Sequence, residues 1–270
     1  MGKHYVPQYY LKGFSQNNGK YIWVYDKKDG VKFPTQVKSI ANITGFYSKE
    51  VERYLANTIE RPANTVLTKI RQFERIEQRD KEVLSEYMAV MIKRVPKGLQ
   101  RLEEVAPSII RKLFAELTEE LSQIALDRQE NKDVAERRIK NIEAILKKYS
   151  KDPPKEIWLE NIPPERSPIV VATLNGMTWR FLVSKNESEF LTSDNPLFFF
   201  SSIGIRKPIS EVLFPIAKNI PLWATWKTQL PEGLINTTSQ AVKEMNRRTT
   251  SYATRYLFKS KDEDWICLFQ

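Results

Sequence analysis

The chain has 270 residues, of which 41% are hydrophobic and 28% are charged, and this balance excludes a wholly disordered protein. Lysine and arginine number 43 against 33 acidic residues, and the resulting net charge of +10 favours a polyanionic partner, either nucleic acid or a nucleotide. No run reaches the roughly 20 apolar residues of a membrane span, and the single cysteine, Cys267, excludes an internal disulfide, so we expect a cytoplasmic protein without a membrane partner.

Residues 1–48 are expected to form an extended N-terminal segment. The stretch YIWVYD (21–26) is rich in aromatic and β-branched residues, and KKDG after it is typical of a turn. VKFPTQVKS is then expected to be its hairpin partner, at a sheet edge because Pro34 cannot donate to a neighbouring strand. Such short strands need further partners. We therefore expect YIWVYD to pair with a strand from beyond residue 155.

Residues 49–150 are expected to form a large helical insertion within a single domain that spans residues 1–270. Apolar residues recur at helical spacing in three stripes, which run from Val83 to Ile92, from Ile110 to Ile124 and from Val134 to Leu146. Pro96 and Gly98 interrupt the first run. KDPP, at 151–154, is expected to end the helical part.

Residues 155–270 are expected to be rich in strands, with one helix. SPIVVATLNGMTWRFLVS is predicted to be a β-hairpin around Asn175-Gly176. The further strands are expected in EFLTSDNPLFFF, EVLFPI, IPLWATWKT and TRYLFKS, and the helix in NTTSQAVKEMNRRTTSYA. The sequence thus predicts an α+β fold: a mixed, mainly antiparallel sheet with a large helical insertion.

Three stretches carry polar residues in unusual settings, whereas phosphate loops, G-x-S-x-G and H-E-x-x-H motifs are absent. HYVPQYYLKGF (4–14) holds the only histidine, and it is either a docked segment or an arm that delivers an imidazole. TSDNP (192–196) fits a turn, or a carboxylate and an amide that face a ligand or a hard metal ion. MNRRTTSYATRYLF (245–258) interleaves arginine with tyrosine, which suits phosphate contacts or a solvated helix face.

These stretches together resemble the bacterial family catalogued as domain of unknown function 4238. Five motifs are similar to those of the family and stand in the same order over residues 4–258: HYVPQYYLKGF, GFYSKEVERYLANTIERPANTVLTKI, AVMIKRVPKGLQ, FLTSDNPLF and EMNRRTTSYATRYLF. Carried over by position, the resemblance implies one shared site with the polar residues His4, Gln8, Glu60, Arg94, Asp194, Asn195, Asn246 and Arg255. Many members begin with paired histidines, whereas Lys3 precedes His4 here, which argues against a mechanism that needs two imidazoles.

Our first hypothesis is a metal-assisted phosphodiesterase, a nuclease that acts on RNA or DNA in a defence or toxin setting. His4 would be the general base or acid beside the Asp194 turn, and Asp194 and Glu60 would hold Mg²⁺. The expected catalytic residues are His4, Asp194, Asn195 and Glu60. The expected substrate contacts are Gln8, Arg94, Asn246, Arg247, Arg248 and Arg255.

Two alternatives stay open at this point. One is a non-catalytic module that binds nucleic acid, a nucleotide or a protein, and the other is hydrolysis or transfer on a small nucleotide. Convergence of the motif side chains at one cleft would favour an enzyme, whereas burial in separate places would favour a structural role. The sequence leaves the oligomeric state open.

Overall fold

A computed structural model describes residues 3–16, 19–129, 132–151, 153–184, 188–229 and 231–262, so that Cys267 lies outside the described residues. The chain divides into two compact units, residues 1–96 with 162–270, and residues 97–161. None of the described helices is long and apolar enough to cross a membrane. The assignment of the whole chain to a single domain stays a prediction.

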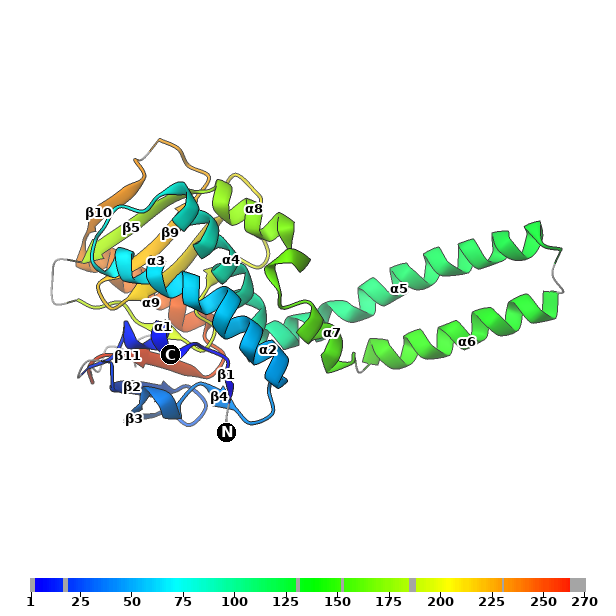
Figure 1. Cartoon of the computed structure of the whole chain (residues 1–270), viewed down its shortest axis with the longest axis horizontal. Coiled ribbons are helices and arrows are strands. Elements are labelled where there is room, and N and C mark those ends of the chain that lie inside the picture. The colour runs from blue at the N-terminus through cyan, green and yellow to red at the C-terminus, as the bar shows by residue number, and fades with distance from the viewer. Residues whose placement is uncertain are drawn as a thin grey trace. The chain divides into compact units, whose positions relative to one another are not determined.

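The first unit contains two main sheets (Figure 1). The five-stranded sheet has the order β10-β5-β9-β8-β7, and its β10–β5 pair is parallel whereas the other pairs are antiparallel. The four-stranded sheet has the order β3-β2-β11-β6 and is antiparallel throughout. A short pair, β1–β4, stands apart from both. The strands are β1 Lys3–His4, β2 Tyr21–Asp26, β3 Val31–Gln36, β4 Asn42–Ile43, β5 Thr178–Ser184, β6 Thr192–Ser193, β7 Phe198–Phe199, β8 Glu211–Ala217, β9 Ile220–Thr225, β10 Gly233–Thr237 and β11 Tyr256–Lys259.

Helices cover one face of the five-stranded sheet, where α3 packs on β8 and α4 packs on both α3 and α8 (Figure 1). The helices of this unit are α1 Gln8–Lys12, α2 Lys49–Tyr54, α3 Arg61–Arg71, α4 Gln78–Arg94, α8 Pro168–Gly176 and α9 Ser239–Tyr252, with a π-helical turn η2 at Leu55–Glu60 and 3₁₀ turns η1 Val37–Ser39 and η3 Pro164–Arg166. The second unit holds α5 Pro96–Asp127, α6 Lys132–Lys151 and α7 Lys155–Glu160. The fold is therefore α+β, as predicted.

The aromatic run at the N-terminus forms part of the core of the first unit. Tyr10, on α1, is completely buried and stacks on Phe214 of β8 with 5.2 Å between ring centroids. Its hydroxyl bonds to Thr192 Oγ1 in β6 at 2.6 Å and to the Pro215 carbonyl in β8 at 2.7 Å. One side chain thus joins a strand of each main sheet.

Several predicted pairings are confirmed. YIWVYD forms β2, which pairs with β3 in an antiparallel hairpin and on its other side with β11 from the far end of the chain. Pro34 lies in β3, at the edge of the four-stranded sheet. The break at Pro96 is also present, because α4 ends at Arg94 and the residue before the proline is extended.

The predicted hairpin around Asn175-Gly176 is wrong. Residues Pro168–Gly176 form α8, and only the second half of the stretch is a strand, β5. Pro168 stands in the first turn, where its missing N–H costs nothing, and Asn-Gly ends this helix instead of turning a hairpin. Burial of Thr173 and Leu174 outweighs the weak helix propensity of the β-branched residues.

Two other boundaries differ from the prediction. The helical part does not end at KDPP but continues through α7 and α8. The strand β10 was not predicted, because its residues GLINT show little apolar alternation and its pairing with β5 is non-local.

Candidate functional site

The family motifs form two polar networks in the first unit. The N-terminal network contains His4, Gln8, Glu60 and Arg94, and the C-terminal network contains Asp194, Asn195 and Arg255. Asn246, Arg247 and Arg248 make separate contacts on α9. Tyr5, which is buried, follows His4 in the chain, and burial and the nearby Asp194 carboxylate raise the pKa of its hydroxyl. The two networks are thus neighbours, but they are distinct sets of bonds.

In the N-terminal network His4 is held as a neutral ring. Its Nε2 donates to the Lys38 carbonyl at 3.2 Å, and its Nδ1 accepts from Gln8 Nε2 at 3.4 Å. These two bonds require the tautomer that carries its proton on Nε2. Burial lowers the pKa of His4 below its ordinary value of 6.5. The orienting partner of His4 is therefore Gln8 and not, as expected, the Asp194 turn.

Arg94 forms the centre of the same network. The side chain is 1% exposed, and its Nη1 donates to Glu60 Oε1 at 2.6 Å, while Nη2 donates to the backbone carbonyl of His4 at 2.8 Å. Glu60 is the last residue of the π-helical turn η2, and a π-helix is a rare conformation. Loss of one partner from a buried ion pair costs about 3–5 kcal/mol. Arg94 and Glu60 thus anchor the N-terminal strand to α3 and α4.

In the C-terminal network both oxygens of Asp194 are engaged by the backbone. Oδ1 accepts from Thr254 N at 2.8 Å, and Oδ2 accepts from Arg255 N at 2.8 Å and from Tyr256 N at 3.1 Å. Burial raises the pKa of Asp194, against the lowering effect of these three bonds and of Lys27. The carboxylate therefore fixes the chain where it passes from α9 into β11.

The amide side chains also bond to the backbone. Asn195 Nδ2 donates to the Tyr252 carbonyl at 3.0 Å, at the end of α9. Asn246 accepts from Leu191 N at 3.0 Å and donates to the Glu189 carbonyl at 2.9 Å. Both asparagines are about 2% exposed. They tie α9 to the segments before and after β6.

The arginines expected to contact substrate are paired with acids. Arg255 forms a fork with Asp26, with Nη2–Oδ2 at 2.6 Å, and also contacts Asp29.

On α9, Arg247 and Arg248 both bond to Glu244, and Arg248 also bonds to Glu211 at 2.7 Å. These two arginines lower the pKa of Glu244 to about 2.

No group of three His, Cys, Asp or Glu side chains in the described ranges could hold a metal ion. Glu60 and Asp194 lie in different networks, so the predicted pair of Mg²⁺ ligands has no common donor set here. The catalytic and substrate-binding roles of the motif residues stay predictions. The geometry gives each of them contacts that hold the fold.

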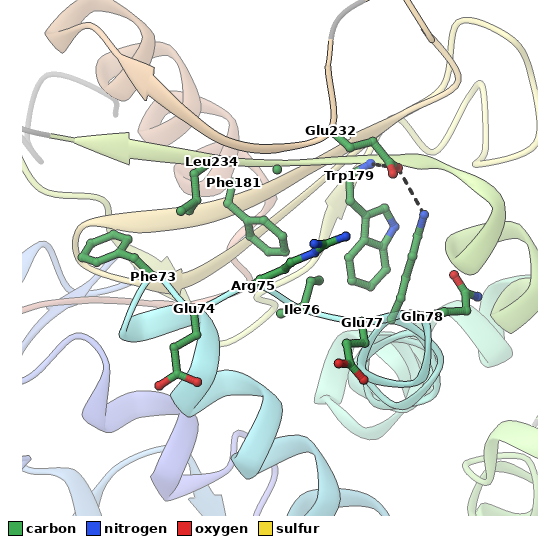
Figure 2. Close-up of a pocket in the computed structure, with 12 residues that line it drawn as sticks. Phe73, Glu74, Arg75, Ile76, Glu77, Gln78, Trp179, Phe181, Glu232 and Leu234 are labelled. Carbon is green, nitrogen blue, oxygen red and sulfur yellow. Dashed lines mark hydrogen bonds and ion pairs between the residues drawn. The ribbon is translucent and has the colours of Figure 1, made fainter.

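A cavity of about 480 Å³ lies elsewhere in the first unit, between the α3–α4 connection and the β5–β10 side of the five-stranded sheet (Figure 2). Its lining combines aromatic and charged side chains: Phe73, Glu74, Arg75, Glu77, Lys81, Trp179, Phe181 and Glu232. This volume is ordinary for a small-molecule site. None of these residues belongs to the site that the sequence predicts.

Phe73 has a backbone conformation that is unusual for an aromatic residue. Its φ is +60°, and the Phe73 and Glu74 amides close the end of α3 by donating to the Ile70 and Lys69 carbonyls. This arrangement is a Schellman motif, in which glycine normally occupies the left-handed position. For a residue with a side chain the conformation costs about 1–2 kcal/mol, and the ring of Phe73 remains 41% exposed. Burial of the Phe73 side chain therefore offsets little of the free-energy cost of its backbone conformation.

Arg75 is the cation of the lining that is free to meet a ligand. Figure 2 shows its side chain extended toward Phe181 and Trp179, while Glu74 and Glu77 point away from them. Among the described residues Arg75 has no ion-pair or hydrogen-bond partner for its guanidinium. Glu77 instead caps α4 in a reciprocal arrangement with Asp80.

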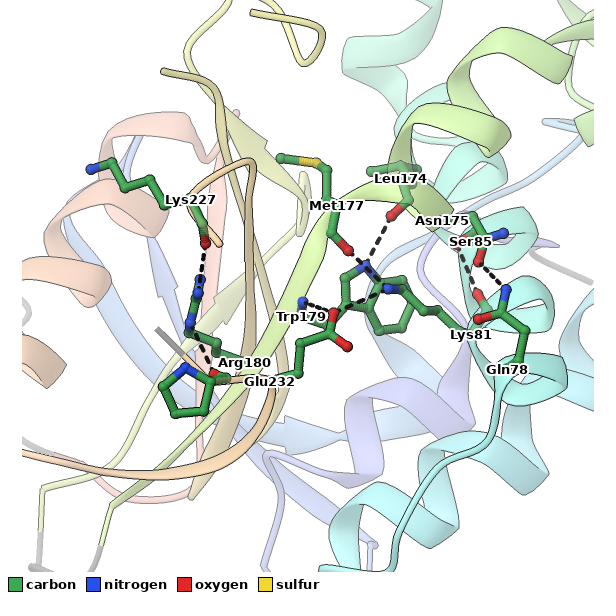
Figure 3. A network of polar contacts seen from close by, with 11 residues as sticks. Gln78, Lys81, Ser85, Leu174, Asn175, Met177, Trp179, Arg180, Lys227 and Glu232 are labelled. Atoms are coloured by element: carbon green, nitrogen blue, oxygen red, sulfur yellow. Dashed lines mark hydrogen bonds and ion pairs between the residues drawn. The ribbon is translucent and has the colours of Figure 1, made fainter. Parts of the chain in front are cut away.

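One wall of the cavity is a bonded network around Trp179 (Figure 3). Lys81 donates to the Met177 carbonyl at 2.9 Å and to Glu232 at 3.3 Å, and its ammonium lies 5.4 Å from the centre of a Trp179 ring. Trp179 donates from its indole to the Leu174 carbonyl, and Glu232 accepts from the Trp179 amide. Both charges of the Lys81–Glu232 pair are thus compensated within the protein. This wall is a preformed surface.

The fold and these sites define an α+β protein with two polar motif networks and a separate aromatic cavity. A family model described as "Protein of unknown function (DUF4238)" matches residues 3–263, and the chain belongs to this family. We found no match among curated proteins or among solved structures.

The first prediction concerns Asp194→Asn. The amide keeps the shape of the carboxylate but turns a donor toward backbone N–H groups, so at least one of them loses its acceptor. We expect a loss of about 2–4 kcal/mol in the free energy of unfolding, measured by urea denaturation. The matched control is Asp29→Asn, which weakens an exposed ion pair and should cost at most about 1 kcal/mol. Equal stability of Asp194→Asn and wild type would restore the catalytic interpretation of the turn.

The second prediction concerns the neutral state of His4. Because burial lowers its pKa in the folded state, the unfolded chain binds the proton first as the pH falls through about 6.5. The contribution of His4 to stability is therefore complete above this pH and decreases below it. Between about pH 7.5 and pH 5.5 the urea midpoint of wild type should fall more than that of His4→Gln. Parallel decreases in the two proteins would contradict a pKa lowered by burial.

Proposed function

We propose that the protein is a non-catalytic module that binds a small ligand with a planar ring and an anionic group, such as a nucleoside monophosphate, in the cavity beside Phe73. The sequence leaves open a non-catalytic module that binds nucleic acid, a nucleotide or a protein, and of these three ligands we propose a nucleotide. The engagement of the motif residues in two separate networks of contacts within the protein argues for their structural role. A cytoplasmic location, where such nucleotides occur, is part of the proposal.

The observation that carries the proposal is the strained conformation of Phe73. Backbone strain persists where the surrounding structure imposes it, and it collects at ligand sites. Glycine would close α3 at lower cost, but it would leave the cavity without this ring. A half-exposed aromatic ring offers a face on which a base stacks, and such stacking contributes about 1–3 kcal/mol.

Arg75 supplies the complementary charge. A guanidinium binds a phosphate through two parallel N–H donors, and it requires no prior release from an acid partner here. The carboxylates of the lining do not prevent an anionic group from binding at Arg75. Glu232 is paired with Lys81. Glu74 and Glu77 point away from Phe181 and Trp179 (Figure 2). The ligand is thus expected to stack on Phe73 and to pair its anionic group with Arg75.

The third prediction tests this site by calorimetric titration of the full chain with AMP, GMP, CMP and UMP and with the four parent nucleosides. At least one monophosphate should bind, and its parent nucleoside should bind tenfold or more weakly, because the charged bond to Arg75 contributes about 1.5–3 kcal/mol. Arg75→Gln should abolish this difference. Phe73→Gly should weaken both ligands fivefold or more.

Two controls separate binding from stability. Arg79→Gln removes an exposed arginine four residues from Arg75 that is not part of the lining, and it should bind like wild type. Phe73→Ala should lose binding like Phe73→Gly. Its free energy of unfolding should be about 1 kcal/mol lower than that of Phe73→Gly, because alanine retains the backbone strain and glycine does not. Absence of heat with every nucleotide, or binding that Arg75→Gln leaves unchanged, would overturn the proposal.

The same protein should leave RNA and DNA uncut, with and without Mg²⁺. Cleavage that His4→Ala abolishes would instead support the phosphodiesterase hypothesis.

A further inference from the structure

The second unit, residues 97–161, buries very little apolar surface within itself. Helices α5 and α6 are joined by a connection of only a few residues, which makes them antiparallel neighbours (Figure 1). Between residues 107 and 157, no apolar side chain among those described is buried. Two helices alone cannot enclose a core, and helical hairpins usually acquire one from further helices.

The apolar residues of α5 form two adjacent stripes. The less exposed stripe contains the buried Ala106 and the half-buried Leu102, Ile110, Phe114, Leu117 and Leu121. The exposed stripe, one position earlier in the chain, contains Val105, Ile109 and Leu113, which are 46%, 56% and 42% exposed. A single stripe suffices for a helix with one neighbour, whereas a wide apolar face is typical of a helix with two.

Helix α6 repeats this arrangement. Its half-buried residues are Ala135, Ile139, Ile142 and Leu146, and beside them Val134, Ile145 and Tyr149 are exposed. Each helix of the hairpin thus presents apolar side chains that no described part of the second unit covers. Contiguous apolar surface of this kind marks an interaction site.

The charges of the two helices indicate what covers these stripes. From residue 108 to 127, α5 carries four acidic residues against two basic ones, whereas α6 carries seven basic residues against three acidic ones. A second copy of the chain, related by a twofold axis, would place α5 of each copy beside α6 of the other. Every neighbouring pair of helices would then combine an acidic with a basic helix, as in an alternating four-helix bundle.

We propose that the α5–α6 hairpin is half of a four-helix bundle that a second copy of this chain completes. A 20-residue helix such as α6 is about 30 Å long, and two helices side by side are about 20 Å wide. The interface would bury roughly 600 Å² on each partner, at the low end for a specific complex. The dimer therefore dissociates at low protein concentration.

The fourth prediction is tested by sedimentation velocity of the full chain over a range of concentrations. At high concentration a species of twice the 31.6 kDa chain mass is expected, with conversion to monomer on dilution. Raised salt should favour the monomer, because it screens the contacts between acidic and basic helices. Ile109→Lys and Ile145→Lys should each shift dissociation to at least tenfold higher concentration. A chain that remains monomeric at all concentrations would overturn the proposal.

The matched control is Ala115→Lys, which adds the same charge at an exposed position on the opposite side of α5 from Leu113 and should leave the dimer unchanged. Circular dichroism checks that the variants retain their helices. If a lysine variant unfolds, Ile109→Ala and Ile145→Ala provide the test with milder changes. A dimer that persists in all stripe variants would place the interface elsewhere and contradict the inference.

Discussion

The first unit depends on the insertion of its N-terminal segment between its two main sheets. Tyr10 is fully buried, and its hydroxyl bonds at once to Thr192 in the four-stranded sheet and to the Pro215 carbonyl in the five-stranded sheet. A buried hydroxyl without partners would destabilise the fold by about 1–3 kcal/mol, so this segment and the two sheets must assemble together. The other contacts of residues 4–14 follow from this placement. Arg94 holds the His4 carbonyl, and Arg71 donates to the carbonyls of Tyr9 and Tyr10. A segment near the start of the chain thus becomes part of the core.

This constraint also explains why the family motifs are scattered from residue 4 to residue 255. Several motif side chains join segments that are distant in sequence: Arg94 joins α4 to the N-terminal strand, and Asp194 joins the turn after β6 to the start of β11. Likewise, the β2–β11 pairing and the ion pair between Arg255 and Asp26 join segments that are more than 200 residues apart. Asparagine, aspartate and arginine suit this task because they satisfy several buried backbone groups at once. A motif of polar residues can therefore belong to a fold and not to a reaction.

Local patterns predicted the elements whose own residues decide them, and failed where distant contacts decide. The β2–β3 hairpin was predicted from the aromatic and β-branched residues of YIWVYD and from the KKDG turn, which are local features. The segment 168–176 was predicted as a strand because four β-branched residues precede Asn-Gly, yet contact with α4 makes it a helix. The special character of Asp194 was visible in its TSDNP setting, but no sequence pattern tells whether a carboxylate faces a metal ion or three backbone amides. The cavity could not be predicted from the sequence. The left-handed position at the end of α3 is usually marked by a glycine, and here a phenylalanine occupies it, so no sequence signal indicates the strained conformation.

We propose that the motif residues hold the fold and that the cavity beside Phe73 binds the ligand. Hydrogen–deuterium exchange of the full chain, with and without a saturating nucleoside monophosphate, tests both halves in one measurement. Exchange should slow at residues 73–78 and at the start of β10, which line the cavity, and it should be unchanged at residues 4–8 and at the Asp194 turn. Protection confined to His4, Gln8 and the Asp194 turn would contradict the account and return the active site to the motif residues.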